Sequence, residues 1–166
     1  MNTSIFKKIA LTLAIAIVPL QVTQAIPLAP LATTAAAVCT AYPYTSASMA
    51  MKIAGSAISN PSMAGTIVGC SLGAIATSSL VGYMVGKEIT IRLNKGHFSS
   101  ALSTYATALF ASYTAGTLSS IISTVAPATV TAITATTFLS SLQMTLGVVP
   151  AAMACKVIKD RYFGDK

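Results

Sequence analysis

The fold is decided by residues 60–86, NPSMAGTIVGCSLGAIATSSLVGYMVG, a stretch without a charged side chain. Asn is a good helix N-cap and Pro fits the first helical position, so Asn60-Pro61 predicts the start of a helix. We expect this helix to run to about Gly86, where Lys87 and Glu88 begin a polar connection. Because a bilayer core of about 30 Å is crossed by roughly 20 helical residues, the stretch predicts a transmembrane helix.

The rest of the chain contains two further charge-free runs, Ile9–Met51 and Phe98–Cys155. The second run has 58 residues, enough for two crossings, which we expect over about 99–124 and 129–155 with a turn at Ala126-Pro127-Ala128. Charged residues make up only 8% of the chain, against about 25% in soluble domains. The sequence therefore predicts an all-α membrane protein in which a signal peptide precedes three transmembrane helices.

Residues 1–25 are predicted to form the signal peptide. Two lysines make a basic start, an apolar run of 12 residues ends at Leu20, and small residues precede a cleavage site after Ala25. Twelve residues are too few to cross a bilayer alone, which favours cleavage. The alternative is an uncleaved anchor that continues over residues 26–38, although two prolines would interrupt its helix.

Residues 26–60 are rich in Ala, Ser, Thr and Pro and are expected to form an exported leader. Within it, residues 45–59 can form a helix that places Met49, Ile53 and Ser56 on one side and Lys52 on another. Such a helix would lie along the membrane surface. An irregular leader that runs to the first crossing is the alternative, and the residues do not decide between the two.

Basic residues predict the orientation, because loops that remain inside carry an excess of Lys and Arg. If residue 26 starts on the exported side, the loop 87–97 and the tail 156–166 of the three-helix region 61–166 both lie inside. This gives a multi-pass protein of the bacterial inner membrane with its mature N-terminus outside and its C-terminus in the cytoplasm. The basic residues expected to set this topology are Lys87, Arg92, Lys95, Lys156, Lys159 and Arg161.

Small residues recur every fourth position in the first crossing. Residues four apart lie nearly above one another on a helix, and small side chains there let another backbone approach closely. We expect the one-residue slip between two such sets to correct part of the drift of a strict four-residue repeat. The pattern resembles a glycine zipper, which names a packing mode found in many oligomeric membrane proteins. The two sets are Gly65, Gly69, Gly73 and Ser78, Gly82, Gly86.

The second crossing has a similar ladder, and the third contains one strongly polar interior side chain, Gln143. Gln143 is expected to make an interhelical hydrogen bond, and lining a pore is the alternative. Whether the ladder packs within the chain or also between copies is left open by the sequence. The ladder consists of Ser100, Thr104, Ala108, Ser112, Gly116, Ser120 and Thr124.

The residues needed for catalysis or metal binding are not grouped in this sequence. Its carboxylates are Glu88, Asp160 and Asp165, and its one histidine is His97. A zinc site needs three or four convergent ligands, and an active site needs grouped acids, bases or nucleophiles. The basic residues form no dense stripe of the kind that binds nucleic acid. We therefore expect no enzyme, cofactor, metal or nucleic-acid partner, and no small-molecule substrate is evident.

The expected partners are the lipid bilayer and either further copies of this chain or another membrane protein. The favoured role is a structural or assembly subunit that associates with itself or is part of a larger membrane complex of the secretion or pilus kind. The order of leader, apolar helix, short basic loop and apolar helix resembles conjugative pilins before assembly, but a third crossing and a long Ala/Thr leader depart from that pattern. The alternatives are a holin-like, pore-forming protein and an accessory or immunity-type binder of a membrane protein.

Overall fold

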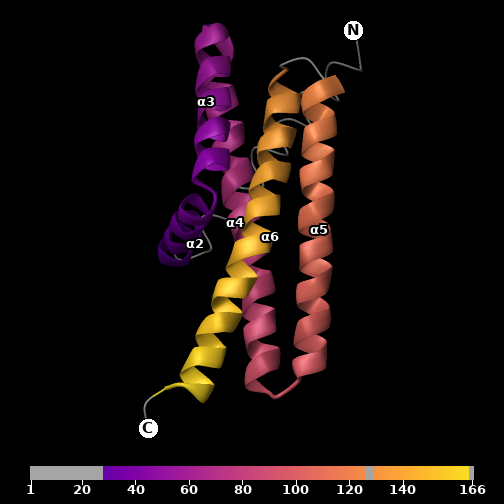
Figure 1. The fold of residues 1–166 in the computed structure, drawn as a ribbon. Coiled ribbons are helices and arrows are strands. Elements are labelled where there is room, and N and C mark those ends of the chain that lie inside the picture. Colours follow the sequence, from indigo (N-terminus) through magenta and orange to yellow (C-terminus); the bar gives the residue numbers. More distant parts are fainter. Residues whose placement is uncertain (1–27, 126–128, 165–166) are drawn as a thin grey trace, which may run out of the picture.

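The computed structural model describes residues 28–125 and 129–164, and this part of the chain is almost entirely helical, without a strand (Figure 1). The all-helical fold predicted from the sequence is therefore confirmed for these residues. The predicted signal peptide and the turn at 126–128 lie outside them. The elements are α2 (Leu28–Ala41), α3 (Pro43–Ser59), a short 3-10 turn η1 (Pro61–Met63), α4 (Ala64–Asn94), α5 (Phe98–Val125) and α6 (Val130–Tyr162).

Among the residues that the structure describes, three helices are long and apolar enough to cross a membrane: α4 with η1, α5 and α6. They form an elongated bundle in which α6 packs against both α4 and α5 (Figure 1). The prediction of three such helices is confirmed. Their number, length and composition are compatible with a small membrane protein.

The predicted loop 87–97 is much shorter in the structure, because α4 continues to Asn94. Glu88 and Arg92 form an ion pair one helical turn apart, which stabilises helical rather than loop backbone. The chain reverses at residues 95–97, where Gly96 has a φ of 79°. A side chain at this left-handed position would be strained, so glycine ends the helix here.

The segment before the bundle is helical rather than irregular. The predicted helix over residues 45–59 is present as α3, with Met49, Ile53 and Ser56 half-buried and Lys52 exposed. However, α3 runs alongside part of α4 and packs on it, so it does not lie across the end of the bundle as a surface helix would (Figure 1). A helix in this range was expected only if an uncleaved anchor continued over residues 26–38. The structure has α2 there, and it packs against α4 and α6.

The start of the first crossing differs from the prediction. Asn60 does not cap the following helix: its Nδ2 donates backwards to the carbonyl of Ser56, 3.2 Å away. Asn60 therefore ends α3, and Pro61 opens a 3-10 turn before α4. At the same end of the bundle, Thr129 is the N-cap of α6 and its hydroxyl accepts from the N–H of Ala132 at 3.2 Å.

Candidate functional site

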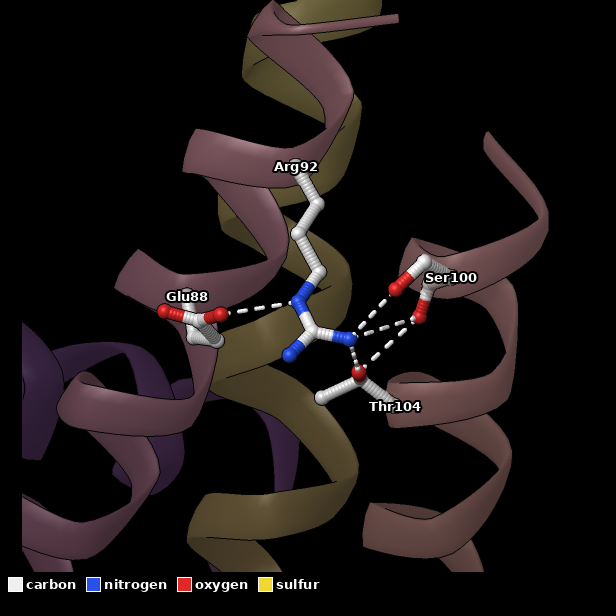
Figure 2. Close-up of polar contacts among 4 residues, drawn as sticks. All are labelled: Glu88, Arg92, Ser100 and Thr104. Atoms are coloured by element: carbon white, nitrogen blue, oxygen red, sulfur yellow. Dashed lines mark hydrogen bonds and ion pairs between the residues drawn. The ribbon is translucent and has the colours of Figure 1, made fainter. Parts of the chain in front are cut away.

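Arg92 joins α4 to α5 next to the turn between them (Figure 2). Its Nη1 donates to the hydroxyls of Ser100 and Thr104, at 2.5 and 2.9 Å, and its Nε donates to Glu88 Oε1 at 2.8 Å. Ser100 and Thr104 are the first two members of the predicted α5 ladder. A residue expected to set topology and two expected to pack helices thus form one polar contact.

Arg161, near the end of α6, bonds to the end of α4. Its Nη1 donates to the carbonyl oxygen of Leu93 at 2.9 Å. The last carbonyls of a helix lack partners within it and carry partial negative charge, so an arginine is a favourable cap there. The other four predicted topology residues are exposed and, within the described chain, make no side-chain hydrogen bond or ion pair: Lys87, Lys95, Lys156 and Lys159.

The two small-residue sets of α4 do not share one groove. A Cβ built on Gly82 would lie 2.8 Å from Thr145 Cβ, and one on Gly86 would meet Met153 and Pro150, so both glycines face α6. Gly65 and Gly69 are exposed, and a Cβ on either would have nothing within 4 Å.

The expectation that the one-residue slip corrects part of the drift was wrong for a geometric reason. A helix turns by about 100° per residue, so a four-residue step advances the face by about 40° and a five-residue step by about 140°. The five-residue step from Gly73 to Ser78 therefore carries the repeat toward the opposite side of α4. Gly73 itself is half-buried, whereas Ser78 is fully buried.

Hydroxyl groups bond across the helix contacts. Thr145 Oγ1 of α6 donates to the carbonyl of Ser78 at 3.1 Å. Ser112 Oγ of α5 donates to the carbonyl of Gln143 at 2.7 Å, and Ser119 bonds to Ser140 across the same pair of helices at 2.8 Å.

The α5 ladder is buried only in part. Ala108 and Ser112 are buried and Gly116 is half-buried, whereas Ser120 and Thr124 are exposed. The buried face of α5 continues instead through Ala115 and Ser119. The reason is again the drift of a four-residue repeat around the helix. The signal that could have identified the true contact face is the alternation of four- and three-residue steps through Ala108, Ser112, Ala115 and Ser119.

Gln143 belongs to α6, and its side chain lies at the contact with α5. Its side chain covers Gly116, where a Cβ would be 2.6 Å from the Gln143 carboxamide carbon. Gln143 is exposed, and its carboxamide makes no hydrogen bond within the described chain. The carboxamide contacts α5 by packing, and the bond between the helices at this residue goes to its backbone carbonyl instead, so the expected hydrogen bond of the side chain is absent from the described part of the structure.

A pocket of about 460 Å³ lies between α3, α5 and α6; we name it the hydroxyl pocket. Nine of its lining residues are serines or threonines: four on α3, two on α5 and three on α6. Lys52 and Asn60 also line it, and no described lining residue carries a carboxylate. Sequence reasoning missed this pocket because its residues come from three separate segments, although the high Ser and Thr content of each was visible.

No group of three or more His, Cys, Asp or Glu residues that could hold a metal ion occurs in the described chain. Glu88 is exposed and paired with Arg92. The polar groups that the structure brings together are therefore hydrogen-bond donors and cations, suited to helix packing and to binding an anion.

No family model, curated protein or solved structure matches this chain.

Proposed function

We propose that this chain is a structural subunit of the bacterial inner membrane that associates with further copies of itself. The observation that carries the proposal is the unused half of the α4 glycine repeat. Gly65 and Gly69 are exposed with open space beside them, and Val68 and Leu72 next to them are exposed as well. Helices associate in lipid where small residues let their backbones approach, so this face suits a second copy.

The charge distribution supports the proposed orientation. The described basic residues other than Lys52 gather at the end of the bundle that contains the α4–α5 turn and the end of α6. By the bias of Lys and Arg toward inside loops, this end faces the cytoplasm and the mature N-terminal segment begins outside. Gln143 covers Gly116 at a helix contact, which favours a packing role over the holin-like alternative.

Disulfide crosslinking in membranes tests the self-association. In a variant whose three free cysteines are replaced by alanine, Gly65→Cys and Gly69→Cys should each give a covalent dimer on mild oxidation. Leu102→Cys is the control, since Leu102 is 68% exposed on α5, away from the proposed face. A dimer yield at Gly65 and Gly69 no higher than at Leu102 would refute the proposed interface.

A further inference from the structure

The hydroxyl pocket combines many hydrogen-bond donors with one positive charge. We propose that it binds the phosphate group of an acidic phospholipid, in the leaflet at the end of the bundle opposite the α4–α5 turn, with Lys52 as the charged contact. The proposal requires that the bundle spans a bilayer but does not rest on self-association, because the pocket lies within one copy of the chain.

Only some of the polar side chains in the hydroxyl pocket form hydrogen bonds with one another. Thr137 is 3% exposed, lines the pocket, and has no side-chain hydrogen bond within the described chain. The hydroxyls of Ser48 and Ser56 on α3 also have no partner there, whereas Ser119 and Ser140 bond to each other. A polar group held at bilayer depth without a partner is costly, so these hydroxyls favour a ligand that accepts hydrogen bonds.

The chemistry of the lining selects an anion. Every polar side chain in it can donate a hydrogen bond, and Lys52 adds a full positive charge that no described carboxylate neutralises. A phosphodiester has no donor, accepts several hydrogen bonds and carries one negative charge. Its charge matches that of Lys52, and a pocket of about 460 Å³ has ample room for such a group.

The depth of Lys52 favours a lipid as the source of this phosphate. Lys52 lies seven residues before Ser59, the end of α3, which corresponds to about 10 Å along the helix. If Lys87 marks one edge of a core of about 30 Å, the other edge falls near Ile67, one turn inside the start of α4. Lys52 is then a few ångströms inside the core, and its long side chain reaches the headgroup layer.

Native mass spectrometry of the full chain in detergent tests the proposal. With added phosphatidylglycerol, the protein should retain one lipid molecule more strongly than with phosphatidylcholine, whose headgroup has no net charge. Lys52→Gln should weaken the phosphatidylglycerol adduct about fivefold, as expected for one lysine near an anionic headgroup. Lys87→Gln is the matched control, since Lys87 is also exposed and without a partner in the described chain but lies at the other end of the bundle, and it should leave the adduct unchanged.

Thr137→Val provides a second variant, which removes one hydroxyl from the hydroxyl pocket at nearly constant volume. It should weaken phosphatidylglycerol retention while helicity by circular dichroism stays at the wild-type value. Equal retention by the wild type and Lys52→Gln would overturn the proposal. Displacement of the lipid by millimolar glycerol phosphate or inorganic phosphate would overturn the lipid as the source, because a free phosphate would then fill the same site.

Discussion

Arg92 contributes to the bundle mainly through its bonds to α5. Its ion pair with Glu88 joins two partly exposed side chains on one helix, and such pairs contribute about 0.3–0.5 kcal/mol. The two hydroxyls of α5 receive charge-assisted hydrogen bonds, each worth about 1.5–3 kcal/mol where they are well buried. Because the Arg92 side chain is 35% exposed, we expect the lower part of that range.

Replacement of Arg92 should therefore be costlier than replacement of its acidic partner. We expect Arg92→Gln to lower the free energy of unfolding in detergent by about 1–2 kcal/mol and Glu88→Gln to lower it by less than about 0.5 kcal/mol. Denaturant titration followed by circular dichroism measures both. Equal losses for the two variants would mean that the ion pair, rather than the contact between helices, stabilises this end.

Two fully buried serines on one face of α4 differ in whether the side-chain hydroxyl makes a hydrogen bond. Ser78 Oγ donates to the carbonyl of Ala74 at 2.6 Å, and no hydrogen-bond partner is found for the buried Ser71 Oγ in the described chain. Helix propensity changes by the same amount when either becomes alanine, so the difference between the variants reports the hydrogen bond.

The variant Ser71→Ala should be more stable than Ser78→Ala by about 1 kcal/mol, since an unpaired buried hydroxyl is lost in one case and a bonded one in the other. Unfolding of the two single variants under one detergent condition gives this difference directly. A Ser71→Ala protein that is no more stable than Ser78→Ala would show that the Ser71 hydroxyl is bonded in the native protein.

The individual roles of these residues could be predicted only in part from the sequence. The sequence identified Arg92 as basic and Ser100 as small, but their contact depends on α4 continuing through the expected loop. The cap that Arg161 provides for α4 depends on the register between two helices far apart in the chain. Such contacts follow from packing angles, which no local pattern specifies.

Among the helices, α4 presents two different glycine faces, and substitutions on them should have opposite effects. Gly82→Ala forces a Cβ against Thr145, including its backbone, and overpacking of this kind costs about 1–3 kcal/mol. Gly69→Ala meets open space and replaces a poor helix former, which favours the folded state by up to about 1 kcal/mol.

Thermal unfolding in dilute detergent, where copies are kept apart, checks this pair of variants. The melting temperature should fall for Gly82→Ala and stay equal or rise for Gly69→Ala. If both variants lost stability equally, Gly82 would not contact Thr145 in the detergent-solubilised protein, or Gly69 would be buried in a stable oligomer.

The long helices were predictable because absence of charge over 20 or more residues is a strong local signal. Their ends and contact faces were not, since Asn60 can cap a helix on either side of it and a four-residue repeat drifts around its helix. The helix α2 was expected only as part of an uncleaved anchor, because two prolines were expected to interrupt a helix there. Its packing against α4 and α6 is a tertiary effect that no local pattern shows.

Across the whole molecule, large apolar side chains remain on the surface of the bundle. Leu102, Phe110 and Tyr113 of α5 are 68%, 73% and 72% exposed, and Leu72 and Met84 of α4 are similarly uncovered. A monomeric protein in water rarely exposes so much contiguous apolar surface. A surrounding lipid bilayer would account for this surface, and the three apolar helices and the low charge of the chain are compatible with one.

Labelling of single cysteines by a water-soluble maleimide in permeabilised membranes tests this claim most directly, because the reagent needs a hydrated thiol. Phe110→Cys lies near the middle of α5 and Lys95→Cys at the exposed turn, both in a background without native cysteines. Lipid around the bundle predicts rapid labelling at position 95 and almost none at position 110 until detergent and denaturant are added. Equally rapid labelling at both positions in intact bilayers would contradict the claim that α5 is surrounded by lipid.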